Sequence, residues 1–184
     1  ALEYPEKTQW AQNAQDLAKE LAKVEKPDLG IRRFLLAADL ANGKMAVVPD
    51  IEKLAQEAAR DGKTLMLLGY ARRAVGKTNG AYNTFKRAYQ VDKSLADAQL
   101  QAGILALNLG VVEEARSLFE DLYKKAPGAP RVNTALAALD FRQDKLKRAR
   151  KLLLQALTLE TGRARARDRS TAYVLRARIA LKEG

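Results

Sequence analysis

The sequence contains neither cysteine nor histidine among its 184 residues. Without cysteine there can be no disulfide, no zinc–thiolate site and no thiol nucleophile. Without histidine the chain lacks the commonest general base and the commonest transition-metal ligand of proteins. Both absences weigh against catalysis, and we expect a non-enzymatic protein with no cofactor and no metal site.

Residues that interrupt helices are also few, with five prolines and eleven glycines, whereas alanine and leucine are plentiful. This composition favours helix. No apolar run approaches the roughly 18–20 residues that a membrane-spanning helix needs. With 47% hydrophobic and 30% charged residues, the chain can bury a core and keep a polar surface.

Negative charge is scarce towards the C-terminus. The whole chain has a net charge of +11, and residues 142–184 hold thirteen Lys and Arg against four Asp and Glu, a net of +9. The densest run is 162–169, where arginine alternates with other residues. Such a block indicates nucleic acid, an anionic membrane surface or an acidic protein partner. Only Tyr173 lies near enough to stack on a base, which makes nucleic acid an unlikely partner.

Three segments of the chain repeat without a gap at a period of 34 residues, which is typical of stacked-repeat proteins. The aligned residues are Gly69, Gly103 and Ala137; Ala81, Ala115 and Ala149; Phe85, Phe119 and Leu153; and Gly76, Gly110 and Asp144. We expect the small residues to lie where two helices approach closely and the large ones to wedge between successive helix pairs. The last set is expected in tight turns, because these residues tolerate a left-handed backbone.

Apolar spacing and breaker residues predict the helices. The expected ranges are 5–26, 31–42, 49–60, 64–75 with 78–90, 95–109 with 112–125, 130–143 with 145–160, and 163–181. The first carries an apolar stripe made of Trp10, Ala14, Leu17, Leu21 and Val24, with Trp10 as its anchor. An extended link is expected at 45–48.

These positions resemble the tetratricopeptide repeat (TPR) family over residues 62–161. Leu68-Gly69 match the family's Leu-Gly pair, the alanines and large residues above match its second helix, and Pro127 matches its proline. The family's early tryptophan is replaced by Leu65, Gln99 and Asn133. The resemblance implies an all-α fold, a right-handed α-solenoid of antiparallel helix pairs with nine to ten helices. It divides the chain into a capping helix plus a degenerate repeat (1–61), repeats at 62–95, 96–129 and 130–163, and a C-terminal capping helix or the start of a further repeat (162–184).

The resemblance also implies a concave groove that binds a peptide or helix of another protein. Its inward positions are the second, fifth, ninth, twelfth and thirteenth of each repeat. They are Lys63, Met66, Tyr70, Arg73 and Ala74; Asp97, Leu100, Ile104, Leu107 and Asn108; Arg131, Thr134, Ala138, Phe141 and Arg142; and, continuing the register, Arg165, Arg169 and Arg176. Such a groove has an apolar middle and a basic end, and suits an amphipathic or acidic segment.

We therefore expect a scaffold or adaptor that binds a protein or peptide, in the assembly of a bacterial envelope, pilus, secretion or motility complex. A periplasmic or membrane-associated location is favoured over a cytoplasmic one. One alternative is a protein that binds an anionic membrane surface or RNA through residues 142–182. Another is a scaffold that self-associates through its open ends. A third is that the terminal helix covers the apolar groove residues.

Overall fold

The computed structural model describes the backbone of residues 5–158 and 166–183, and the side chains of residues 13–158 and 169–182. All regular structure in the described backbone is helical: ten α-helices and one short 3₁₀ helix, so the all-α prediction is confirmed. In the part of the chain described, no helix is long and apolar enough to span a bilayer.

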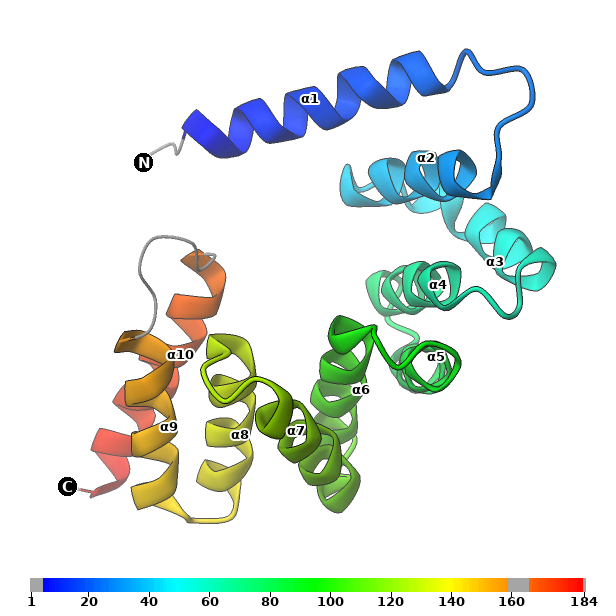
Figure 1. The fold of residues 1–184 in the computed structure, drawn as a ribbon. Coiled ribbons are helices and arrows are strands. Elements are labelled where there is room, and N and C mark those ends of the chain that lie inside the picture. Colours follow the sequence, from blue (N-terminus) through cyan, green and yellow to red (C-terminus); the bar gives the residue numbers. More distant parts are fainter. Residues whose placement is uncertain (1–4, 159–165, 184) are drawn as a thin grey trace. The chain divides into compact units, whose positions relative to one another are not determined.

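The chain divides into two units, residues 1–92 and 93–184. The first unit holds α1 (Pro5–Leu21), α2 (Leu29–Ala41), the 3₁₀ helix η1 (Met45–Val47), α3 (Val48–Glu57), α4 (Gly62–Ala74) and α5 (Thr78–Val91). The second unit holds α6 (Ala96–Asn108), α7 (Val112–Lys125), α8 (Pro130–Arg142), α9 (Leu146–Thr158) and α10 (Ala166–Glu183). Figure 1 shows the helices of each unit.

The 34-residue period corresponds to three helix pairs, α4 with α5, α6 with α7, and α8 with α9. Their first helices begin at Gly62, Ala96 and Pro130, each 34 residues after the one before. The turns within the pairs hold Gly76, Gly110 and Asp144, with φ of 76°, 80° and 60°. The predicted left-handed turn residues are therefore confirmed.

Small residues do lie where paired helices approach closely. A Cβ added to Gly69 would stand 2.7 Å from Cε1 of Phe85, and one on Gly103 would overlap Phe119 in the same way. Both phenylalanines are fully buried. Because there is no room for a methyl group, the second helix of each of these two pairs packs directly on the backbone of the first.

The first helix of the chain ends at Leu21, five residues before the predicted end at Lys26. Part of its apolar stripe is uncovered, since Leu17 is 50% and Val24 is 40% exposed. The side chain of Trp10 lies outside the described residues, so its expected role as anchor stays a prediction. The extended link expected at 45–48 is wrong, because this segment forms η1 and the start of α3.

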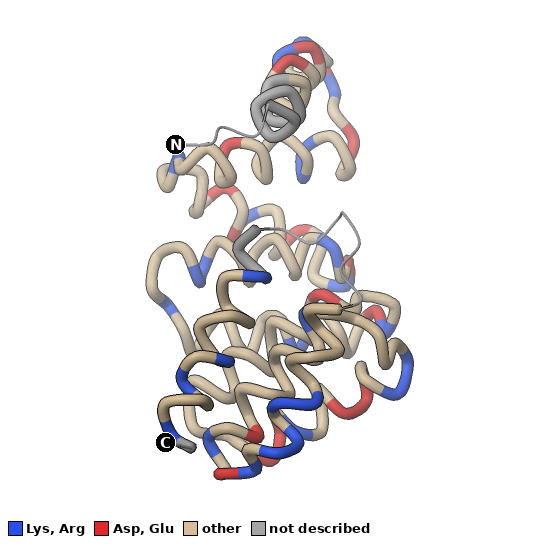
Figure 2. Tube along the Cα trace, turned by 90° about the vertical axis from the view of Figure 1, so that its left-hand side faces the viewer, with Lys and Arg blue, Asp and Glu red and all other residues tan. Residues whose placement is uncertain are grey.

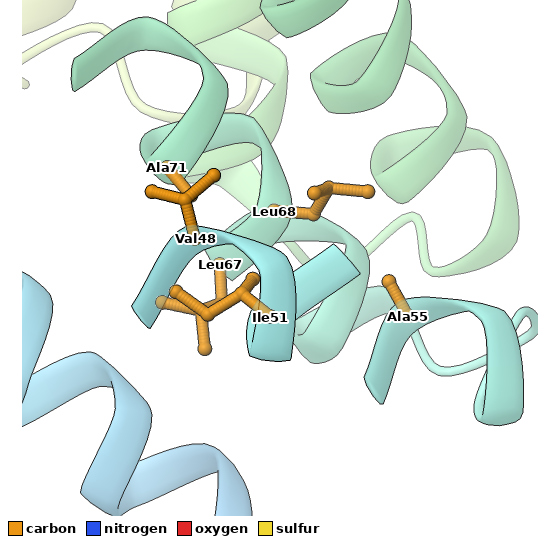
Figure 3. Close-up of a cluster of buried hydrophobic side chains, with 6 residues drawn as sticks. All are labelled: Val48, Ile51, Ala55, Leu67, Leu68 and Ala71. Carbon is orange, nitrogen blue, oxygen red and sulfur yellow. The ribbon is translucent and has the colours of Figure 1, made fainter. Parts of the chain in front are cut away.

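The helices that precede the clean repeats pack on them through an apolar cluster, shown in Figure 3. Its buried members come from α3 and α4 and are Val48, Ile51, Ala55, Leu67, Leu68 and Ala71. Leu36 and Leu40 of α2 also pack against it. The degenerate repeat is thus joined to the first clean repeat by one continuous core.

Asp61 joins α2 to α4 through polar contacts. Its carboxylate caps α4 by accepting hydrogen bonds from the amide N (2.7 Å) and Oγ1 (2.5 Å) of Thr64. It also accepts one from Nη1 of Arg33 at 2.7 Å. Burial alone would raise the pKa of Asp61, but the hydrogen bonds from Thr64 and the charge of Arg33 outweigh it and lower the pKa below its ordinary value.

We expect Asp61→Asn to lower the free energy of unfolding at pH 7 by about 1 kcal/mol. The pKa is lower in the folded state, so the carboxylate stabilises the fold above the unfolded-state pKa, and this stabilisation is lost as the pH falls through the folded-state pKa. Urea unfolding at pH 7 and at pH 3 should therefore show a difference between the variants that shrinks in acid.

Asp28→Asn is the matched control for this pH dependence. Asp28 caps α2 by accepting a hydrogen bond from the amide of Ile31 at 2.8 Å, and asparagine caps helices about as well. We expect a change within a few tenths of a kcal/mol for this variant. Equal effects at the two caps would show that the Arg33 contact adds nothing.

Candidate protein-binding surface

In the first unit, the predicted groove residues of α4 form a partly open strip. Lys63 and Arg73 are exposed, and Met66 and Tyr70 are half-buried. The Tyr70 ring packs edge-on against Phe85, with centroids 5.0 Å apart and an interplanar angle of 81°. The Arg73 guanidinium lies 5.1 Å from the centre of the Tyr70 ring. Tyr70 is therefore held in place and leaves part of its ring open, with a cation beside it.

In the second unit, predicted groove residues of α6 and α8 contact each other at both ends of the two helices. Nη1 of Arg131 lies 3.0 Å from Oδ1 of Asp97, and these residues hold the second position of successive repeats. At the other end, Nη1 of Arg142 donates to the carbonyl oxygen of Leu107 at 2.5 Å. These predicted groove residues of α6 and α8 therefore lie on facing sides of the two helices.

Some of the predicted groove residues of α6 and α8 are buried and so cannot contact a partner. Leu100, Leu107 and Thr134 are buried, so their side chains are not open to a partner. Ile104 and Phe141 are half-buried. The apolar surface that this unit offers is therefore smaller than the sequence predicts.

The register of α10 differs from the prediction. Its described part begins at Ala166, directly after residues 159–165, which the structure does not describe, so this position does not give the length of the repeat. Burial shows the difference instead: Tyr173 and Val174, which the 34-residue period aligns with the buried Leu139 and Asp140, are 55% and 57% exposed. The 34-residue period therefore does not extend to α10.

Contacts show which residues of α10 face α8 and the turn after it. The Arg178 guanidinium and the Lys182 ammonium lie 5.5 and 5.6 Å from the centre of the Phe141 ring. Nζ of Lys182 also lies 2.5 Å from Oδ1 of Asp144. Arg178 and Lys182 were not predicted, because the 34-residue period was extended past the third repeat, where its register does not hold.

The arginines predicted beyond the third repeat lie elsewhere. Arg176 lines a cavity together with Arg150 and Lys151 of α9. Arg169 is half-buried and already has an interaction. Arg165 lies outside the described residues. The cations of α10 therefore lie on two sides of the helix, with one side facing α8 and the other facing α9. Figure 2 shows Lys and Arg recurring along α9 and α10.

We define the α8–α10 face as Phe141, Arg142, Arg178 and Lys182. It presents a half-buried aromatic ring with three cationic side chains around it or near it. Within the described residues no group of three carboxylates could hold a metal ion. This face can offer an apolar contact and positive charge, the combination that suits a peptide with an apolar anchor and acidic residues.

Comparisons with known proteins agree with this architecture. No model of a known protein family matches the sequence, and no curated protein matches it. Solved structures do match in fold. MamA has a TM-score of 0.67 at 16% identity, covering 86% of this chain and 95% of its own. TTC0263, a TPR protein of Thermus thermophilus, has a TM-score of 0.65 at 20% identity, covering 92% and 87%.

PilF of Pseudomonas aeruginosa is similar as well, with a TM-score of 0.70 at 15% identity, covering 94% of this chain and 84% of PilF. Because these structures are only 15–20% identical in sequence to this chain, the similarity is evidence about the fold alone. The matches extend beyond residues 62–161 into both flanks, where the sequence itself carries few repeat signals. The chain has the helical solenoid fold of the tetratricopeptide repeat proteins.

Proposed function

We propose that the chain is a non-enzymatic scaffold that holds a segment of another protein against the exposed side of its first helices. The observation that carries this proposal is the α8–α10 face, where Arg178 and Lys182 lie over the ring of Phe141. A ring that is half-buried and flanked by cations resembles the anchor sites of protein interfaces, which are rich in aromatic residues and arginine.

The positive charge of the α8–α10 face favours a partner segment that carries acidic residues. Lys182 already pairs with Asp144, and Arg142 donates to the carbonyl of Leu107. The Arg178 guanidinium lies beside the Phe141 ring and, in the part of the chain described, has no carboxylate partner. A carboxylate from a partner could pair with Arg178 without displacing an existing ion pair, and so at a smaller desolvation cost.

We also propose that the role belongs to the assembly of a bacterial multiprotein complex, in the periplasm or at a membrane. The support for this setting is analogy of fold with bacterial TPR proteins such as that of Thermus thermophilus. The α8–α10 face itself supports partner binding and does not depend on this setting.

Site-specific photocrosslinking in the native cells tests the binding face. A photoreactive amino acid at Asn108, an exposed position of α6 next to Leu107, should yield a discrete adduct with a partner protein. The same amino acid at Ser117, an exposed position of α7, serves as the control and should not. Phe141→Ala combined with Arg178→Glu should abolish the adduct, and rising salt should weaken it.

Two results would contradict the proposal. One is the same adduct from Asn108 and from Ser117. The other is an adduct from Asn108 that survives Phe141→Ala with Arg178→Glu, because binding would then not use the α8–α10 face.

A further inference from the structure

A cavity of about 330 Å³, here called the α3–α5 cavity, lies in the first unit between α3, α4 and α5. The buried part of its lining is made of Ala55, Leu65, Leu68 and Thr84. The polar, more exposed part is made of Glu52, Gln56, Arg72, Asn83 and Arg87. The volume is near the lower limit of the roughly 300–1,000 Å³ of ligand sites, so the cavity suits one aromatic side chain.

This cavity is separate from the predicted groove. Leu68 lines the cavity and Tyr70 lies on the groove side of α4, and two residues turn a helix by about 200°. The other walls come from α3 and α5, which are not first helices of the repeats. A ligand of the cavity would therefore bind a surface that the α8–α10 face does not include.

The 34-residue period extends back to α3, so the cavity can be compared with the same place in a later repeat. Ile51 of α3 lies 34 residues before Phe85 of α5, and both are fully buried. The same is true of Leu54 and Ala88. Each residue of the cavity therefore has a counterpart 68 residues further on, among α7, α8 and α9 of the second unit.

The counterpart of Ala55 is a tyrosine. Tyr123 is half-buried on α7, which packs on α8 as α3 packs on α4. Leu65 in turn holds the position at which the TPR pattern has a tryptophan. The cavity thus lies where two aromatic rings are replaced by smaller side chains.

The charged residues differ as well. In the second unit, Nε of Arg148 lies 3.3 Å from Oδ2 of Asp140, and its Nη2 donates to Oε1 of Glu120 at 2.5 Å. The counterparts of Arg148 and Asp140 in the first unit are Gly80 and Arg72. A side chain is therefore lost at one position, and the charge changes from negative to positive at the other.

Positive charge exceeds negative charge in the lining of the α3–α5 cavity. Its one acid, Glu52, is offset by two cations, since Oε1 lies 3.9 Å from Nε of Arg72 and 3.7 Å from Nζ of Lys77. Arg87 is exposed, and its Nη2 donates to the carbonyl oxygen of Ala59 at 2.9 Å. Within the described residues Arg87 has no carboxylate partner, so an acidic group at the opening of the cavity could pair with it.

We propose that the α3–α5 cavity binds an aromatic side chain of a partner protein that has an acidic residue beside it. The ring fills the place left by Ala55 and Leu65, as Tyr123 does for the chain itself in the second unit. The adjacent carboxylate pairs with Arg87. An aromatic side chain enclosed by apolar groups, with arginine at its edge, is the arrangement found at the centres of many protein interfaces.

Fluorescence anisotropy with the full chain and three labelled peptides tests the proposal. The first peptide has one tyrosine between glutamates, the second has alanine in place of the tyrosine, and the third has lysine in place of each glutamate. We expect the first to bind and each change to weaken binding at least about tenfold. Ala55→Tyr, which copies Tyr123, should fill the cavity and weaken binding of the first peptide by a similar factor, and Arg87→Glu should weaken it several-fold.

Lys53→Glu is the matched control for Arg87→Glu, since Lys53 is an exposed cation of α3 outside the cavity; binding should stay within about twofold. Phe141→Ala with Arg178→Glu should also leave binding of this peptide unchanged, which distinguishes failure of this proposal from failure of the α8–α10 face. Circular dichroism checks that each variant is folded. Because Arg87 is exposed, Arg87→Glu tests the site even if Ala55→Tyr does not fold.

Several outcomes would overturn the proposal. Absence of binding by the first peptide, or equal binding of the alanine peptide, would remove the aromatic anchor. Binding that is unaffected by Arg87→Glu and by a folded Ala55→Tyr variant would place the peptide elsewhere. Binding of 4-hydroxyphenylacetate that is lost in Ala55→Tyr, with no binding of the first peptide, would assign the cavity to a small aromatic acid.

Discussion

Gly69→Ala is expected to lower the free energy of unfolding by about 2 kcal/mol, although alanine is the better helix former by about 1 kcal/mol. A Cβ at this position would lie 2.7–2.9 Å from three atoms of the Phe85 ring. Phe85 is fully buried, so its ring cannot move away without shifting α5 against α4. Urea unfolding followed by circular dichroism measures the loss.

The third repeat suggests the compensating change. There the same two positions hold Ala137 and Leu153, both buried. Phe85→Leu alone should cost about 1–2 kcal/mol through the cavity it leaves. Combined with Gly69→Ala, it should cost about 1–2 kcal/mol less than the sum of the single changes, because the methyl group then occupies the space that the ring leaves.

Gly80→Ala is the control for this double-mutant cycle. Gly80 also lies in a helix of the first unit, but a Cβ there would meet its nearest atom, Cδ of Arg72, at 3.5 Å, an ordinary contact. This variant should be neutral or more stable by up to about 1 kcal/mol. Strict additivity of Gly69→Ala and Phe85→Leu would show that the close approach does not determine this packing.

The helix pairs could be predicted from the sequence because the pairing depends on contacts that recur at fixed spacing. A residue too small to hold two helices apart, a large residue opposite it and a turn residue with positive φ recur every 34 residues. Each restricts the geometry locally. The prediction for residues 62–158 was therefore right in both helix order and turn positions.

The surface residues were harder to predict. The 34-residue period was extended past residue 163 without repeat markers to support it, and Arg176 was therefore assigned to the face on which Arg178 lies. Periodicity also gives the direction of a side chain without the distance to its neighbours. Leu100 was placed correctly on α6, but its burial depends on how other helices pack around it.

An ionic network around one buried carboxylate in the second unit was not predicted at all. Asp140 is fully buried, with Oδ1 3.3 Å from Nη2 of Arg116 and Oδ2 3.3 Å from Nε of Arg148. Nη2 of Arg148 donates to Oε1 of Glu120 at 2.5 Å. That hydrogen bond, with the charge of Asp140, raises the pKa of Arg148 although burial opposes the rise. The network joins α7, α8 and α9. The sequence held one signal for it, because Asp140 stands where the preceding repeat has the buried Ala106.

Asp140→Asn is expected to lower the free energy of unfolding by about 3 kcal/mol, because it keeps the shape of the side chain and leaves two arginines without their buried counter-charge. Thermal and urea unfolding measure the loss. Asp144→Asn is the matched control, since Asp144 pairs with Lys182 at the surface and its side chain is 70% exposed. Asparagine also tolerates the positive φ of this turn, so the control should cost less than about 1 kcal/mol.

A double-mutant cycle separates the ionic contribution from the loss of packing. If the penalty comes from uncompensated charge, Asp140→Asn should cost at least about 1 kcal/mol less in an Arg148→Gln background than in the wild type. An unchanged penalty in that background would assign the effect to packing of the Asp140 side chain. A cost no greater than that of Asp144→Asn would show that the network does not stabilise the junction of α7, α8 and α9.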